Sequence, residues 1–204
     1  MVVRITVLVL FFNISFFCFS KTTVVLAVEN SWPPYSDRLG NGLSKDMIKK
    51  AYHAVNVEVE FLVVPYARAL YMVEHGSVDG AFNVTKQTNT VNKFNFGSEI
   101  LLQATASFYS HTDSKSNVLS ANDIPDGTTV ALILGYEYGD IYQLNKHRFK
   151  EVRVGKQDPI VQLLLNKRTD IAIMFDEVAK ETMTNMGLKH SSLKRGHVNH
   201  QSDI

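Results

Sequence analysis

The stretch ALYMVEHGSVDGAFNV, residues 69–84, has a counterpart of equal length later in the chain, IVQLLLNKRTDIAIMF, residues 160–175. In each stretch an amphipathic helical pattern ends at a polar turn and passes into a short apolar run typical of a strand. Two copies of one helix-to-strand unit indicate a repeated α/β organisation.

Strand and helix patterns alternate on both sides of the two copies. The expected strands are 23–28, 57–64, 78–84, 128–134, 151–154 and 170–175, and the expected helices are 44–55, the segment after Pro65, 140–149 and 158–168. This alternation predicts mostly parallel sheets flanked by helices. Two sets predict two lobes, 21–106 and 107–196, with a crossover within 99–114.

In open parallel sheets, ligands bind beyond the carboxyl ends of the strands. The polar and aromatic residues that follow the expected strands are therefore candidates for a site between the lobes. They are Glu29, Trp32, Tyr35, Tyr66, Arg68, Asn83, Thr85, Tyr136, Glu137, Tyr138 and Asp176. Pro33 and Pro34 restrict the backbone beside Trp32 and would present its ring at low entropic cost. The alternative is that Trp32 is an ordinary core residue.

The chain resembles the polar amino-acid-binding family of ABC-importer solute-binding proteins. The motifs that carry the resemblance, through their order and spacing, are ENSWPPYS, GNGLSKDMIKKAY, YARALYMVEHGSVDGAFNVT, FNFGSEILL, GYEYGD and TDIAIMFDEVA. The resemblance covers about residues 23 to 190 and implies the type II periplasmic-binding-protein fold.

The resemblance also implies roles for individual residues. Glu29 and Asp176 match acidic positions near a ligand's ammonium group, and Trp32 matches a stacking ring. Asn83 and Thr85, with the turn at Tyr136 and Glu137, match positions that hold a carboxylate. Asp176 as a simple helix cap remains an alternative, as do surface or hinge roles for Tyr136 and Tyr138.

Two features depart from the family pattern. Thr90 stands where amino-acid binders carry an arginine that binds the α-carboxylate, so we expect Arg68 to supply a cation, unless it lies on a solvated helix face. The sequence also stops near the expected return to the first lobe. Residues 197–204 would begin that crossover, with the remainder absent and the first lobe incomplete, and a chain ending there is expected to be marginally folded.

The N-terminus reads as a secretory signal peptide, residues 1–20, in which Arg4 precedes an apolar run ending in Cys18-Phe19-Ser20. Its removal takes away Arg4 and the only cysteine, which leaves equal numbers of acidic and basic side chains. That balance favours neither nucleic acid nor a membrane surface as a partner, and no thiol chemistry remains. A lipid anchor on Cys18 is a second interpretation of the same segment.

Together these features predict a periplasmic, monomeric solute-binding protein without cofactor or metal. It would capture a small polar solute, an amino acid or a related compound, for an ABC permease in the inner membrane. One alternative is an enzyme on the same fold, resembling cyclic-acid dehydratases and using Glu29, Glu137 or Asp176 as acid or base. Another is the ligand-sensing domain of a signalling system.

Overall fold

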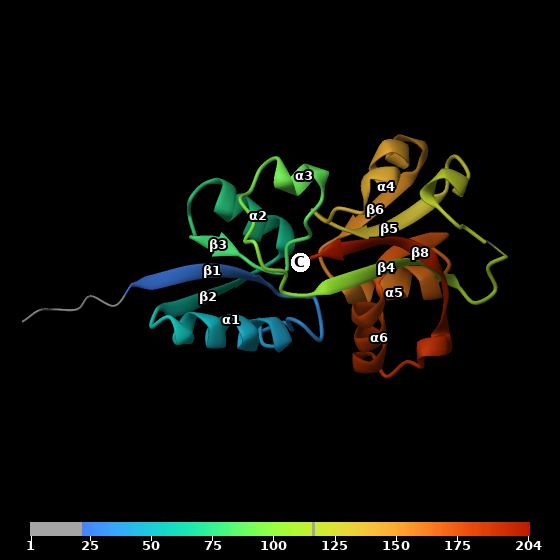
Figure 1. Ribbon diagram of the computed structural model, residues 1–204. Helices are drawn as coiled ribbons and strands as arrows, with labels where there is room; N and C mark the ends of the chain where they lie inside the picture. Colours follow the sequence, from blue (N-terminus) through green and yellow to red (C-terminus); the bar gives the residue numbers. More distant parts are fainter. Residues whose placement is uncertain (1–21, 116) are drawn as a thin grey trace, which may run out of the picture.

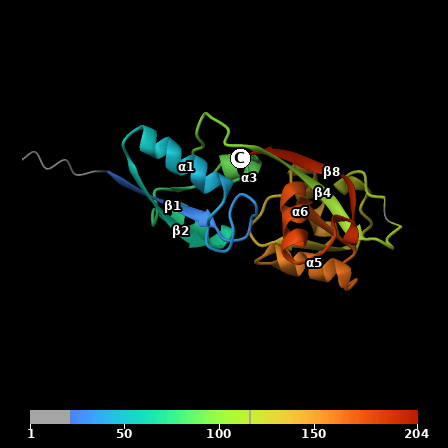
Figure 2. The same ribbon diagram turned by 90° about the horizontal axis from the view of Figure 1, so that it is seen from below.

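The structure is a computed structural model that describes residues 22–115 and 117–204 (Figure 1). The signal peptide expected at 1–20 lies outside the described residues. Two lobes lie side by side, and in each of them helices cover both faces of a central sheet (Figures 1 and 2). No helix in the described ranges is long and apolar enough to cross a membrane.

The first lobe is built on a parallel three-stranded sheet. Its elements are β1 (Thr23–Glu29), α1 (Leu43–Ala54), β2 (Glu58–Val64), α2 (Tyr66–Glu74), β3 (Gly80–Ala81) and α3 (Thr88–Val91), with strand order β2-β1-β3. The central strand β1 is buried over its last four residues. Helices α1 and α2 lie on opposite faces of the sheet (Figure 1), which explains why β1 is apolar on both sides.

The second lobe contains a five-stranded sheet. Its elements are β4 (Gln103–His111), β5 (Thr129–Ile133), α4 (Asp140–Asn145), β6 (Lys150–Val154), α5 (Gln157–Leu165), β7 (Ile171–Phe175), α6 (Asp176–Asn185) and β8 (Leu193–Asp203). The strand order is β6-β5-β7-β4-β8. Because β4 is antiparallel to both of its neighbours, it alone runs against the other four strands. The expectation of two lobes with mostly parallel sheets is therefore confirmed.

The lobe limits differ in detail from those expected. The division at 106/107 falls inside β4, which belongs to the second sheet from Gln103 onward. Residues 197–203, expected to be a connecting segment, are part of β8 and pair with β4. The expected strand 78–84 is reduced to Gly80–Ala81, and Asn83, at φ 62°, leaves the extended conformation soon afterwards.

The lobes touch directly at the end of β5. Gly135 has φ +87°, and a Cβ built on it would lie 2.8 Å from Cβ of Ala67 in α2. Only glycine allows both this backbone conformation and this close approach. The contact lies beside the carboxyl-terminal strand ends of both sheets, where the candidate residues are found.

Candidate functional site

Carboxyl-terminal strand ends of the two sheets face each other across the lobe interface. In the first lobe, β1 pairs with β3 with Ala27 opposite Ala81, and Glu29 and Asn83 each come two residues after this pair. In the second lobe, Tyr136 and Glu137 follow β5, and Phe175 ends β7. Direct hydrogen bonds and ring contacts join these two groups of residues.

Trp32 is buried in a tight loop between the lobes. Its backbone exchanges hydrogen bonds with Ser36, and its ring lies 4.6 Å from that of Tyr35, a partly buried residue of the same loop. Phe175 of the second lobe meets the indole edge to face at 5.5 Å, with an interplanar angle of 87°. The ring of Trp32 therefore lies between the lobes, as expected, and in this structure Phe175 packs against it.

Glu29 is fully enclosed at the end of β1. Its Oε1 accepts a hydrogen bond from the hydroxyl of Tyr136 in the opposite lobe. Burial raises the pKa of Glu29 to about 8, because desolvation disfavours the charged carboxylate more than the Tyr136 hydroxyl favours it. At neutral pH this side chain is therefore mainly an uncharged carboxylic acid.

Glu137 forms a second bridge between the lobes. Its Oε2 accepts hydrogen bonds from the hydroxyls of Tyr66, at 2.9 Å, and Thr85, at 2.8 Å. Burial raises the pKa of the Glu137 carboxyl above its usual range, although these two hydroxyls oppose the shift. The rings of Tyr66 and Tyr136 also meet, with their centroids 4.6 Å apart. Residues expected to line the cleft thus hold the lobes together.

Asp176, the first residue of α6, already has a cationic partner. Arg195 of β8 donates to both carboxylate oxygens, from Nε at 3.0 Å and from the terminal nitrogen at 2.6 Å. Tyr109 and Ser107 donate to the same group. The register of β8 on β4 sets Arg195 opposite Tyr109, which directs both side chains to the carboxylate. The expected role of Asp176 as the partner of a solute ammonium does not fit this geometry.

Two other expected site residues make mainly local contacts. Thr90 is buried, and its hydroxyl donates to the Thr85 carbonyl at 2.6 Å and accepts from the Gln87 amide at 2.9 Å. Arg68 is exposed on α2 and lies over the ring of Tyr71, 5.9 Å from its centroid. Arg68 lines neither interlobe cavity described below, so the expectation that it supplies a cation to the cleft is not supported.

Tyr138 stabilises the turn that presents Tyr136 and Glu137. Its hydroxyl oxygen accepts a hydrogen bond from the Ile133 amide at 2.7 Å. Phe175 and His200 were not among the expected site residues, yet their rings meet at 5.8 Å beside this turn. Phe175 is the last residue of β7, so the expectation that ligands bind beyond the carboxyl ends of strands could have selected it. No sequence signal marks His200, because its position depends on the pairing of β8.

Several buried polar atoms of this interface have no hydrogen-bond partner within residues 22–115 and 117–204. They are Glu29 Oε2, Asn30 Oδ1, Trp32 Nε1, both side-chain amide atoms of Asn83, and His200 Nε2. Polar atoms in a protein interior are nearly always paired. Their concentration near facing strand ends marks the interface as the candidate functional site.

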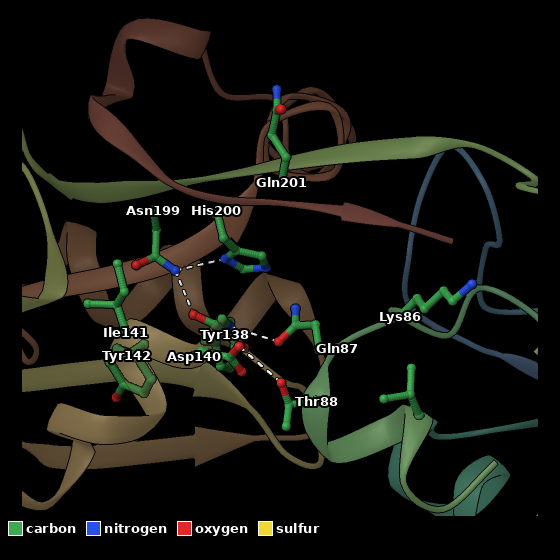
Figure 3. Close-up of a pocket in the computed structure, with 12 residues that line it drawn as sticks. Lys86, Gln87, Thr88, Tyr138, Asp140, Ile141, Tyr142, Asn199, His200 and Gln201 are labelled. Carbon is green, nitrogen blue, oxygen red and sulfur yellow. Dashed lines mark hydrogen bonds between the residues drawn. The ribbon is translucent and has the colours of Figure 1, made fainter.

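Two cavities flank this cluster at the lobe interface. One, of about 520 Å³, is lined by α3 and its preceding turn, by the Tyr138–Tyr142 segment and by Asn199, His200 and Gln201 of β8 (Figure 3). The other, of about 470 Å³, includes Thr90, Tyr136 and Glu137 in its lining. Both volumes fall within the range that binds small molecules.

No protein-family model matches the sequence, and no curated protein does. Solved structures do match. Holo ArgBP from T. maritima has a TM-score of 0.71 at 19% identity, with 89% of this chain and 80% of that chain covered.

Two further structures match to a similar degree. An amino acid ABC transporter substrate-binding protein from Streptococcus pneumoniae, bound to L-arginine, has a TM-score of 0.72 at 17% identity, covering 89% of this chain and 79% of that chain. A histidine kinase sensor domain similar to periplasmic binding proteins has a TM-score of 0.75 at 16% identity, with 90% and 80% covered. The chain therefore has the two-lobed fold of the periplasmic amino-acid-binding proteins.

Proposed function

We propose that this protein is an extracytoplasmic solute-binding protein that captures a small polar solute between its lobes. The observation that carries the proposal is the set of buried, unpartnered polar atoms on Glu29, Trp32, Asn83 and His200. Each such atom costs about 1–3 kcal/mol when it is left without a hydrogen bond. A bound solute that paired with these atoms would remove that cost.

The arrangement suits capture by closure of the two lobes. Hydrogen bonds from Tyr136 to Glu29, and from Tyr66 and Thr85 to Glu137, cross the interface and would break on opening. Hinge closure around a ligand is a known motion of periplasmic binding proteins as a class. In this proposal the interlobe hydrogen bonds hold the closed state, and the solute replaces some of them.

Delivery to an ABC permease in the inner membrane completes the proposal. Support comes from the fold shared with an ABC transporter substrate-binding protein and from the signal peptide that the sequence predicts at residues 1–20. We favour binding over catalysis, since the similar structures are binding proteins and the carboxyl groups of Glu137 and Asp176 are held by hydrogen bonds. Turnover of a prephenate-like acid by the purified protein would contradict this choice.

A ligand-sensing role is the second candidate, favoured by the similarity to a kinase sensor domain. Both candidates require a solute in the cleft and differ in the protein that receives the signal or the cargo. Affinity capture with the tagged protein, in the presence and absence of solute, would recover either a permease or a kinase.

A thermal-shift screen against amino acids, opines, polyamines and small acids tests the capture step. A solute at 100 times its Kd should add about 2.7 kcal/mol to the free energy of unfolding. Asn83→Ala should abolish the shift, because it removes two of the unpartnered atoms. Asn166→Ala, at the exposed end of α5, is the matched control and should retain it. An equal shift in both variants would place the solute elsewhere.

A further inference from the structure

Two carboxyl groups join the lobes in opposite directions. Glu29, in the first lobe, accepts a hydrogen bond from the hydroxyl of Tyr136 in the second lobe. Glu137, in the second lobe, accepts from the hydroxyls of Tyr66 and Thr85 in the first lobe, at 2.9 Å and 2.8 Å. The rings of Tyr66 and Tyr136 contact each other, with centroids 4.6 Å apart. The two bridges therefore form one cluster across the interface.

The described residues around Glu29 offer its carboxyl group hydroxyls and no cation. Tyr136 donates to it, and its charge also acts on the hydroxyls of Tyr66, in α2, and Tyr138, in the turn after β5. His200 of β8 is neutral in the physiological range, because burial lowers its pKa to about 4. A buried carboxylate without a cationic partner is strongly unfavourable. The closed interface therefore suits the protonated form of Glu29.

Charged residues around Glu137 are paired with each other or exposed. Those that line the same cavity as Glu137 form two ion pairs and one exposed group: Arg153–Glu151 at 2.8 Å, Lys93–Glu74 at 3.7 Å, and Lys146. Arg153 favours the ionised form of Glu137, but burial outweighs this effect and raises the pKa of the carboxyl group. Farther along the interface, Asp176 and Arg195 pair with each other.

Closure of the lobes therefore changes the affinity of these carboxyl groups for protons. Burial in the closed structure raises the pKa of Glu29 from 4.5 to about 8, and separation of the lobes would return the group to water and to its ordinary pKa. The contribution of Glu29 to closure is complete below pH 4.5 and is lost as the pH rises through 8. The pKa of Glu137 is raised as well, so its contribution has the same sign.

We infer that the two bridges form a proton-sensitive clasp: the lobes stay closed while Glu29 and Glu137 are protonated and separate when these groups ionise. This inference goes beyond the proposed function, since the opening that it describes needs no solute. For a protein that captures a solute by closure, the clasp would make capture tighter at acidic than at alkaline pH.

Hydrogen exchange of backbone amides across the interface tests the clasp in the absence of solute. The Gly139 amide donates to Gln87 Oε1 at 2.8 Å, and the Gln157 amide donates to Ser31 Oγ at 3.3 Å. In both pairs the donor belongs to the second lobe and the acceptor to the first, so separation of the lobes exposes these amides to exchange. The amides of β7, a strand buried in the second lobe, report on unfolding instead.

The protection of Gly139 and Gln157 should decrease with pH in the wild-type protein. Between pH 6 and pH 8, after correction for the intrinsic pH dependence of exchange, we expect a decrease of at least about tenfold. Protection of both amides should be lower than that of β7 at each pH, because separation of the lobes requires less free energy than unfolding. Protection equal to that of β7 would mean that the lobes do not separate on their own, and would overturn the inference.

Neutral variants identify the groups that titrate. Glu29→Gln keeps the shape of the side chain and an acceptor for the Tyr136 hydroxyl but cannot ionise, so the decrease in protection should be at least several-fold smaller. Glu137→Gln should also reduce it. Glu60→Gln, exposed on β2, is the matched control and should keep the wild-type pH dependence.

Circular dichroism checks that the three variants fold. The same pH dependence in the wild-type protein and in both interface variants would overturn the clasp. It would leave the proposed function standing, because the thermal-shift screen decides separately whether a solute binds.

Discussion

The two lobes share one architecture and differ in how they bury their cores. The second lobe contains an extensive apolar core that includes Leu132, Leu164 and Ile173. Among the described residues, the first lobe has two small clusters of three buried residues each, and its Trp32, Tyr66 and Val84 belong to the large cluster of the second lobe. The first lobe therefore depends on the interface for burial, so its stability and the closure of the cleft are linked.

The largest expected effect comes from core truncation in the second lobe. Leu164→Ala should lower the free energy of unfolding by about 2–5 kcal/mol, because Leu164 is fully buried. Hydrogen exchange should accelerate in both β7 and β1, since the first lobe loses its support. Leu26→Ala, the matched truncation in the first lobe, should accelerate exchange in β1 and leave β7 protected. The opposite pattern would mean that the second lobe depends on the first.

The close contact at Gly135 provides the next test. Gly135→Ala adds a Cβ that would lie 2.8 Å from Ala67, and relief of that overlap should cost about 1–3 kcal/mol and separate the lobes. Gly187→Ala has a similar φ, +71°, with open space around it. It reproduces the backbone strain without the interlobe contact. Small-angle scattering should show an expanded Gly135→Ala protein, and equal profiles for the two variants would remove Gly135 from the account of closure.

Glu29 predicts a pH dependence of stability. Its pKa is raised from 4.5 to about 8 in the folded protein, so its stabilising effect is full below pH 4.5 and is lost as the pH rises through 8. His200, with a lowered pKa, gives the opposite slope, mainly below pH 6.5. Between pH 6.5 and 8 the wild-type protein should lose about 1.5 kcal/mol more than Glu29→Gln. Denaturant titrations measure the free energy of unfolding of both proteins over this range. If it changed equally with pH in the wild-type protein and in Glu29→Gln, Glu29 would not be buried in its protonated form.

Much of the fold could be predicted from the sequence because each element carries its own local pattern. The run 171–175 is apolar throughout, and β7 is buried on both faces. The expectation that ligand-binding residues follow the carboxyl ends of strands selected Glu29 and Tyr136, which the structure joins by a hydrogen bond across the interface. Predicting these positions requires only the location and direction of each strand.

The partner of Asp176 could not be predicted in this way. Arg195 reaches it through the register of β8 on β4, which includes shifts between Ala106 and Ser107 and between Ser107 and Tyr109. Such irregularities depend on tertiary packing and have no local signature. The same pairing brings His200 to Phe175.

The smallest expected effect concerns the exposed link between the lobes. Arg38 and Asp158 form an ion pair at 2.8 Å, with side chains 74% and 41% exposed. Arg38→Ala should change the free energy of unfolding by no more than about 1 kcal/mol, because water and salt screen such pairs. Thermal denaturation at low and high salt measures this effect. A loss comparable to that of Gly135→Ala would show that exposed charges, rather than buried contacts, hold the lobes together.

The central claim is that solute binds between the lobes, against Trp32. This residue is the only tryptophan of the chain, so tryptophan fluorescence reports on the cleft alone. Titration with a solute that binds by calorimetry should change the emission in a saturable way with the same Kd. Trp32→Ala, checked for folding by circular dichroism, should weaken binding by roughly 1–3 kcal/mol. Calorimetric binding with unchanged emission, and with the same Kd in Trp32→Ala, would contradict the account.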